Sequence, residues 1–215
     1  RDKLVTGVQT CALPILSYYA YLPAAIIYKD LTFSFTENYK GKHKFIFWVS
    51  KGKPIKTSMG MSFLYAPFFF IGHAFAYIYN YDTGGFSEPY KLALLLSCVF
   101  YLGLGLFYLK KTLLFYFTPT VTSISIVGIV FGSGLFYYST TLAPMPHTYN
   151  FALVAVFIYY TRQWHLDQSL KNTLIIGIVF GLLSLVRPTN ALIVFIFVFW
   201  NITGFNDIKE RALVY

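Results

Sequence analysis

The chain has 215 residues, of which 57% are hydrophobic, 21% aromatic and only 12% charged, and its formal net charge is +9. About a quarter of the residues of a soluble domain are charged, so this composition excludes an ordinary soluble protein and predicts an all-α, polytopic transmembrane helical protein in a lipid bilayer. The basic excess suits anionic lipid headgroups or phosphates, and without a nucleic-acid-binding motif we expect no nucleic-acid partner.

The first 15 residues read as translated sequencing adapter. The stretch 5–15, with the sequence VTGVQTCALPI, resembles one reading frame of a common short-read library adapter codon for codon, and Arg1-Asp2 fits the bases before its index. We exclude these residues from the fold, which lowers the formal charge to +8. The protein is expected to begin at about Leu16, within a gene, and to stop at Tyr215 without a natural end.

The topology of residues 16–87 has two alternatives. The apolar run 58–81 is interrupted by glycines, Pro67 and His73, so it either spans the membrane or lies along its surface. The loop before it, 29–57, holds seven lysines, and charge counting alone would place that loop in the cytoplasm with 58–81 as a true span.

The rest of the chain predicts five transmembrane helices. Each is long enough and sufficiently free of charge to approach the roughly 20 apolar residues that a bilayer requires. Pro188 cannot continue a helix and restricts Arg187, so we predict a helical hairpin that turns there. The five expected spans are 88–109, 120–143, 144–161, 172–186 and 188–205.

Basic residues mark one side of these spans. Lys110-Lys111, Arg162 with Lys171, and Lys209 with Arg211 fall on the same side, which the positive-inside rule makes cytoplasmic. The segment 206–215 is therefore expected in the cytoplasm. The turn before His147 and Arg187 then lie on the outer side.

Two residues on that outer side are candidates for a binding site. A charge such as Arg187 within apolar segments costs about 2.5 to 3.5 kcal/mol on insertion scales and usually faces a cavity or a partner. Its guanidinium either snorkels to headgroups or binds a phosphate or carboxylate through two hydrogen bonds. His147 is either an interfacial residue or a donor or weak base for a substrate.

The outer loop adds two weaker candidates. Lys56 belongs to a lysine cluster before a helix that should start near Ser58, where it either helps to bind an anion or anchors the chain to anionic lipid. Glu37 is the preferred carboxylate for catalysis, against the alternative of a solvated loop residue. The histidines lack metal-ligand spacing, so the motifs predict no metal site.

Several short motifs, taken in order, resemble a bacterial GT-C glycosyltransferase of the kind related to aminoarabinose transferase and protein O-mannosyltransferases. The resemblance extends over essentially all of 16–215. The motifs are SYYAYLPA from Ser17, KTSMGM from Lys56 with FLYAPFF from Phe63, MPH from Met145, and RPTNAL from Arg187.

This resemblance implies an enzyme that passes a sugar from a polyprenyl-phosphate carrier to an acceptor on the non-cytoplasmic face. Tyr18, Tyr19, Lys56 and Arg187 would bind substrate, and 16–87 would be an outer loop with juxtamembrane helices, in which 58–81 is one such helix. It also implies multi-pass insertion in the bacterial inner membrane with the active face outward. The intact protein could also use a divalent metal.

The resemblance places the family's acidic catalytic motif near Ile15 and Leu16, where the adapter joins the chain. We therefore expect the catalytic carboxylate to be missing and this fragment to be inactive, with Glu37 and His147 as the remaining catalytic candidates. A polytopic transporter or flippase for an anionic or lipid-linked substrate is the alternative, with Arg187 at a broken hairpin. A catalytically silent membrane scaffold is a third.

Overall fold

The computed structural model describes residues 15–35 and 57–202, and this part of the chain is helical and contains no strand. The expected all-α fold is thus confirmed for these residues. The segments 1–14, 36–56 and 203–215 lie outside the described residues, and with them lie most of the adapter stretch, Glu37, Lys56 and the segment 206–215.

The described chain starts with an apolar helix, Ile15–Tyr28, which includes α2 (Tyr21–Pro23) and the π-helical turn η1 (Ala24–Tyr28). Four long helices and several short ones follow in the second described range. They are α4 (Gly60–Ile78), α5 (Glu88–Leu113), α6 (Pro119–Gly132), α7 (Leu135–Thr140), α8 (Pro146–Leu166), α9 (Leu170–Val186), the 3-10 turn η2 (Pro188–Ile193) and α10 (Val194–Val198).

Proline determines where several of these helices begin. Pro89, Pro119 and Pro146 each lie in the first turn of a helix, where the missing N–H has no intrahelical partner to lose. In α5, Glu88 lies in the first turn and Lys110 and Lys111 in the last, which complements the helix dipole at both ends. These starts and charges agree with the local sequence.

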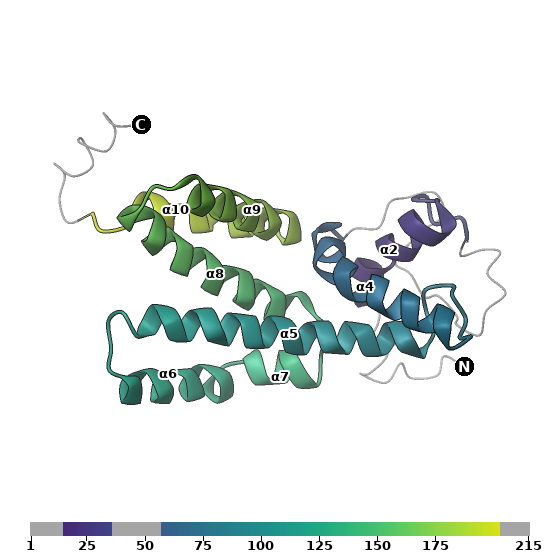
Figure 1. The fold of residues 1–215 in the computed structure, drawn as a ribbon, viewed down its shortest axis with the longest axis horizontal. Helices are drawn as coiled ribbons and strands as arrows, with labels where there is room; N and C mark the ends of the chain where they lie inside the picture. Colours follow the sequence, from purple (N-terminus) through teal and green to yellow (C-terminus); the bar gives the residue numbers. More distant parts are fainter. Residues whose placement is uncertain (1–14, 36–56, 203–215) are drawn as a thin grey trace, which may run out of the picture.

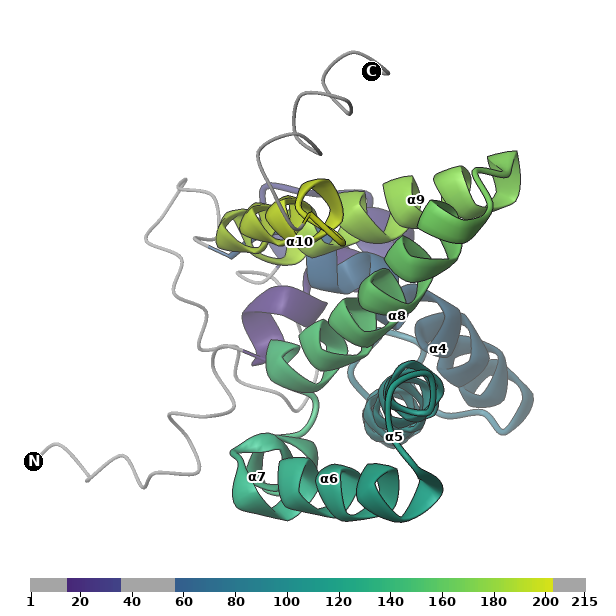
Figure 2. The ribbon, with the colours of Figure 1, turned by 90° about the vertical axis from the view of Figure 1, so that its left-hand side faces the viewer.

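Helix α5 is the axis of the fold (Figure 1). Seen nearly along α5, helix α4 packs on one side of it, α6 and α7 lie below it, and α8 crosses above it (Figure 2). The chain reverses at Arg187, so that η2 and α10 return beside α9 and the Phe197 carbonyl lies 3.1 Å from His165 Nε2. The predicted hairpin with its turn at Arg187-Pro188 is therefore confirmed.

Two of the expected spans are not single helices. The segment 120–143 is divided into α6 and α7, because Ser133 adopts an extended conformation between them. The segment 188–205 begins as a 3-10 turn and its helix ends at Val198, so it is shorter than expected. The other three correspond to the helices α5, α8 and α9. Helix α5 runs four residues further than expected, to Leu113, and α8 runs five residues further, to Leu166.

The apolar run 58–81, whose topology the sequence left open, forms helix α4 over most of its length. It is continuous over 19 residues even though Pro67 lies inside it. By length and composition, α4 and the 26-residue α5 are the two helices in the described chain that could cross a membrane. At 1.5 Å per residue, α5 is about 39 Å long, which exceeds the roughly 30 Å hydrocarbon core of a bilayer.

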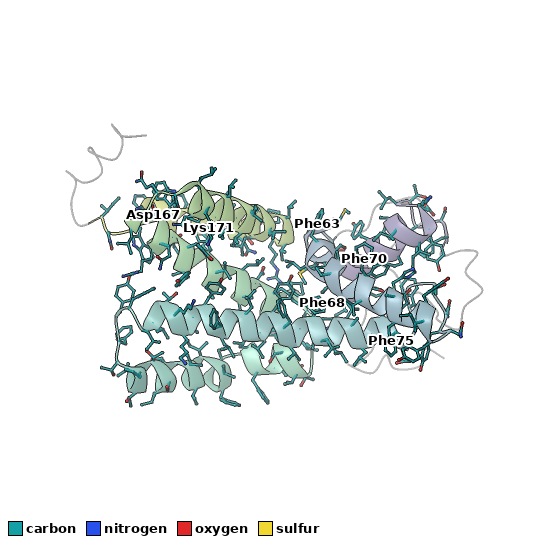
Figure 3. All side chains as sticks on the ribbon, in the orientation of Figure 1. Phe63, Phe68, Phe70, Phe75, Asp167 and Lys171 are labelled. Atoms are coloured by element: carbon teal, nitrogen blue, oxygen red, sulfur yellow. The ribbon has the colours of Figure 1, made fainter. Side chains whose placement is uncertain are left out.

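The outer surface of the described bundle is strongly apolar. On α4, the exposed side chains include Phe63, Phe70 and Phe75, which are labelled in Figure 3. Polar residues such as Ser62 and Ser97 are buried instead. Large exposed apolar surfaces of this kind mark sites of contact with another protein or with a membrane.

Candidate functional site

The segments that carry the GT-C-like motifs meet where α4 begins and α9 ends. The Ser62 hydroxyl donates to the Tyr18 carbonyl at 2.7 Å, and the Ser58 hydroxyl donates to the Val186 carbonyl at 2.9 Å. The Tyr65 hydroxyl donates to the Pro144 carbonyl at 2.6 Å. We call this place the junction, defined by Tyr18, 58–62, Tyr65, 144–147 and 186–190.

A glycine makes the contact between α4 and α9 possible. A Cβ atom on Gly60 would lie 2.3 Å from the Leu185 carbonyl carbon and 2.4 Å from the Val186 nitrogen, both of which are backbone atoms. Small residues allow helix backbones to approach in this way within membranes. Gly60 therefore fixes the first turn of α4 against the last turn of α9, directly beside Arg187.

Arg187 lies at the end of α9 in an extended conformation, with its side chain half-buried. Its backbone N–H donates to the Leu183 carbonyl at 3.1 Å, and its carbonyl accepts from the Asn190 N–H at 2.9 Å. In residues 15–35 and 57–202, the one ion pair is Lys91 with Glu88 at the start of α5, and it does not include Arg187. Within that part of the chain, the guanidinium thus has no carboxylate to neutralise it.

His147 lies in the first turn of α8 and faces the same place. Its ring stacks on Tyr138 with 3.8 Å between the ring centroids. It is close enough to Arg187 for an electrostatic interaction between the two side chains. The first N–H groups of a helix have no intrahelical acceptor, so a cation, an imidazole and a helix N-terminus share one region.

The turn after Arg187 is tied to α8 by a pair of asparagines. The Asn190 side-chain amide donates to Asn150 Oδ1 at 3.1 Å and to the Leu183 carbonyl at 3.0 Å. These bonds link η2, α8 and α9. They hold the Arg187 backbone in place from both sides of the turn.

Replacing Asn190 with Ala should lower the free energy of unfolding by about 1 to 3 kcal/mol, because it leaves partly buried acceptors without their donor. Thermal unfolding of the purified chain in detergent measures this loss. Thr189→Ala is the matched control, since Thr189 is exposed and adjacent. Equal unfolding temperatures for the Asn190 variant and the wild type would contradict this role.

The two tyrosines expected to bind substrate differ in position. Tyr19 is only 3% exposed, and its hydroxyl donates to the Gly85 carbonyl at 2.5 Å. Burial, and then the nearby Tyr90, raise the pKa of Tyr19 well above its usual value, so its hydroxyl stays protonated. Tyr18 is half-buried and close enough to Tyr65 to interact with it, which leaves Tyr18 as the tyrosine at the junction.

The described carboxylates lie away from the junction or are already engaged. Asp30 accepts hydrogen bonds from Ser34 Oγ and Thr32 Oγ1 and from the backbone N–H groups of Thr32 and Phe35. The Ser34 and Thr32 hydroxyls, and then those N–H groups, hold the pKa of Asp30 well below its usual range, so it makes a poor base. Asp167 lies at the opposite end of the bundle (Figure 3).

The preferred catalytic carboxylate, Glu37, and the expected substrate residue Lys56 lie outside the described residues. The neighbour of Lys56 is described, however. The Thr57 carbonyl accepts a hydrogen bond from the Tyr21 hydroxyl at 2.9 Å, next to the Ser58 bond to Val186. The chain therefore enters the junction from the lysine-rich loop.

No group of three or more His, Cys, Asp or Glu side chains that could hold a metal ion is present in the described ranges. The divalent metal implied by the resemblance thus has no fitting ligand set among these residues. We derive no step through a metal.

Sequence reasoning missed Gly60, Tyr65 and Asn150 as parts of this place. Gly60 belongs to a motif and interrupts an apolar run, and Tyr65 belongs to a motif, but neither pattern indicates a contact with a distant segment. Their partners, Leu185, Pro144 and Asn190, are distant in the sequence. A glycine just after the Lys56-Thr57-Ser58 segment was the one available signal for a close helix contact.

Comparisons with protein-family models, curated proteins and solved structures found no significant match to this chain. The junction itself is therefore the basis on which its function is inferred.

Proposed function

We propose that the chain is a fragment of a polytopic membrane glycosyltransferase that moves a sugar from a polyprenyl-phosphate carrier to an acceptor on the non-cytoplasmic face. One observation carries this proposal. Segments near Tyr18, Ser58, His147 and Arg187, which the sequence separates widely, converge around a guanidinium that has no carboxylate partner within the described residues.

The membrane placement is supported by the apolar exterior and by α5, which is long enough to span a bilayer, whereas α4 would lie along the outer face as the resemblance implies. We infer that α8, α9 and the α6–α7 pair are also embedded, packed around α5 in the bacterial inner membrane. Their buried hydroxyls and exposed aliphatic side chains suit that environment. Arg187 would then lie near the outer headgroups.

The chemistry assigned to the junction follows from its charges. Cleavage of a sugar from a phosphate carrier leaves negative charge on the departing phosphate, and a preorganised cation stabilises it. Arg187 would bind the phosphate through its N–H fork, and His147 and the first N–H groups of α8 would add donors. The acceptor hydroxyl requires a base, and Glu37 remains the proposed carboxylate from this chain.

The test is sugar transfer by membranes that contain the uninterrupted gene product, with a radiolabelled polyprenyl-phosphate-linked sugar as donor. We expect label to leave the lipid fraction for an acceptor. If the rate of donor turnover is no higher than in membranes without the protein, the proposal is wrong.

The orientation can be tested by cysteine labelling in a chain whose own cysteines are replaced. Gln168→Cys, in the exposed loop between α8 and α9, should react with a membrane-impermeant maleimide only in inside-out vesicles. Thr83→Cys, in the exposed loop before α5, should react only in right-side-out vesicles. The reverse pattern would place the junction on the cytoplasmic side.

A transporter or flippase for an anionic or lipid-linked substrate is the second candidate. The break between α6 and α7 and the 3-10 turn after Arg187 favour it, since discontinuous helices commonly form transport sites. Vesicles loaded with donor lipid separate the two functions. A transporter moves the intact lipid-linked sugar between leaflets, whereas a transferase releases the polyprenyl phosphate.

A further inference from the structure

We propose that the opposite end of the bundle binds the headgroup of an anionic phospholipid. This surface, called the basic end, consists of Lys110, Lys111, Arg162 and Lys171, together with the aromatic rings beneath Lys111 and Arg162. It joins the last turn of α5, the last turns of α8 and the first turn of α9. This proposal rests on the membrane placement proposed above, and it does not depend on sugar transfer.

Two of the cations are held in position by aromatic rings. Arg162 Cζ lies 3.6 Å from the centroid of the Phe115 ring, and Lys111 Nζ lies 4.5 Å from the Phe107 ring and 5.6 Å from the Tyr159 ring. The Phe115 and Tyr159 rings stack with 5.9 Å between their centroids. Both cations are thus fixed on one continuous aromatic platform.

This arrangement leaves their hydrogen-bond donors available. A guanidinium on a ring face keeps its N–H groups in its own plane, pointing outward from the ring, where they can fork onto two phosphate oxygens. In the described ranges, the ion pair present is Lys91 with Glu88 at the other end of α5, so no carboxylate is within ion-pair distance of these cations. The one carboxylate in their connecting loop is Asp167.

The rings beside the cations indicate which anion fits. Phe107, which lies beneath Lys111, and Tyr116 and Phe117, in the turn that follows α5, are each about half exposed. A diacyl lipid satisfies both features at once, since its phosphate meets the cations and its acyl chains cover the rings. Basic clusters at the cytoplasmic ends of membrane helices attract anionic headgroups in this manner.

The experiment measures phospholipid binding to the full chain in neutral detergent, by native mass spectrometry. We expect phosphatidylglycerol to bind in preference to phosphatidylcholine. Lys111→Gln and Arg162→Gln should each weaken phosphatidylglycerol binding about fivefold, the effect of one cation near the headgroups. Lys91→Gln, on the same helix as Lys111 but at its far end, is the matched control and should bind as the wild type does.

Charge-retaining variants distinguish a binding role from a folding role. Lys111→Arg and Arg162→Lys should keep most of the affinity, and if they lose as much as the glutamine variants the proposal is wrong. Equal binding of phosphatidylcholine would overturn it. So would displacement of the lipid by an equal concentration of inorganic phosphate, because the surface would then bind free phosphate.

Failure here and failure of the transferase proposal are distinguishable. The lipid-binding variants leave Arg187 intact, so sugar transfer reports on the junction alone. A chain without transferase activity can still prefer phosphatidylglycerol at the basic end.

Discussion

Replacing Arg187 with Ala should lower the turnover of a polyprenyl-phosphate-linked sugar by about 100- to 1000-fold, the loss typical of removing one donor from a preorganised anion site. The reason is that no carboxylate neutralises this guanidinium in the described part of the chain, so its charge is available to the departing phosphate. The measurement is transfer from radiolabelled donor in membranes containing the uninterrupted gene product.

Two control variants and one stability measurement accompany the Arg187→Ala variant. Arg187→Lys should recover part of the activity, because it keeps the charge but loses the planar fork. Lys91→Gln, which breaks only the surface pair with Glu88, should leave transfer unchanged. Thermal unfolding should be nearly unchanged in the Ala variant, and undiminished transfer by a folded Ala variant would exclude Arg187 from the site.

Replacing Gly60 with Ala should destabilise the chain by about 1 to 3 kcal/mol, the range found for overpacked cores. The added methyl group would lie 2.3 Å from the Leu185 carbonyl carbon, and a backbone atom cannot move aside as a flexible side chain can. The first turn of α4 must therefore separate from α9, which also removes the Ser58 bond to the Val186 carbonyl. Thermal unfolding in detergent measures the loss.

Helix α9 supplies the matched control for this substitution. Gly181→Ala adds the same methyl group where no atom lies within 4 Å, so it should be neutral or stabilising by up to about 1 kcal/mol. A Gly60 variant as stable as the Gly181 variant would show that α4 and α9 do not pack this closely.

The sequence predicts well where the cause is local. The turn at Arg187 follows from Pro188, which affects only its own residue and the one before it. Pro89, Pro119 and Pro146 likewise determine the start of a helix at their own positions. The all-α fold follows from composition, since a long apolar chain in a membrane must satisfy its backbone hydrogen bonds internally.

Features that depend on distant residues were not predicted, and neither was one local break. The run 120–143 has no charged residue and was expected to be one helix. The break at Ser133 falls within Gly132-Ser133-Gly134, a local signal that this expectation did not use. The close contact of Gly60 with α9 joins residues more than 120 positions apart in the chain. Tyr19 belongs to a motif expected to bind substrate, but it is 3% exposed and donates its hydroxyl to the Gly85 carbonyl, a contact that the motif does not reveal.

The most direct test of the account is photocrosslinking of the purified chain with a diazirine-bearing polyprenyl phosphate. We predict labelled peptides from the first turn of α4 and from the Arg187 turn, with labelling lost in Arg187→Ala and absent for the unphosphorylated polyprenol. Equal labelling by the polyprenol, or labelling that is unchanged in Arg187→Ala, would contradict a phosphate site at the junction.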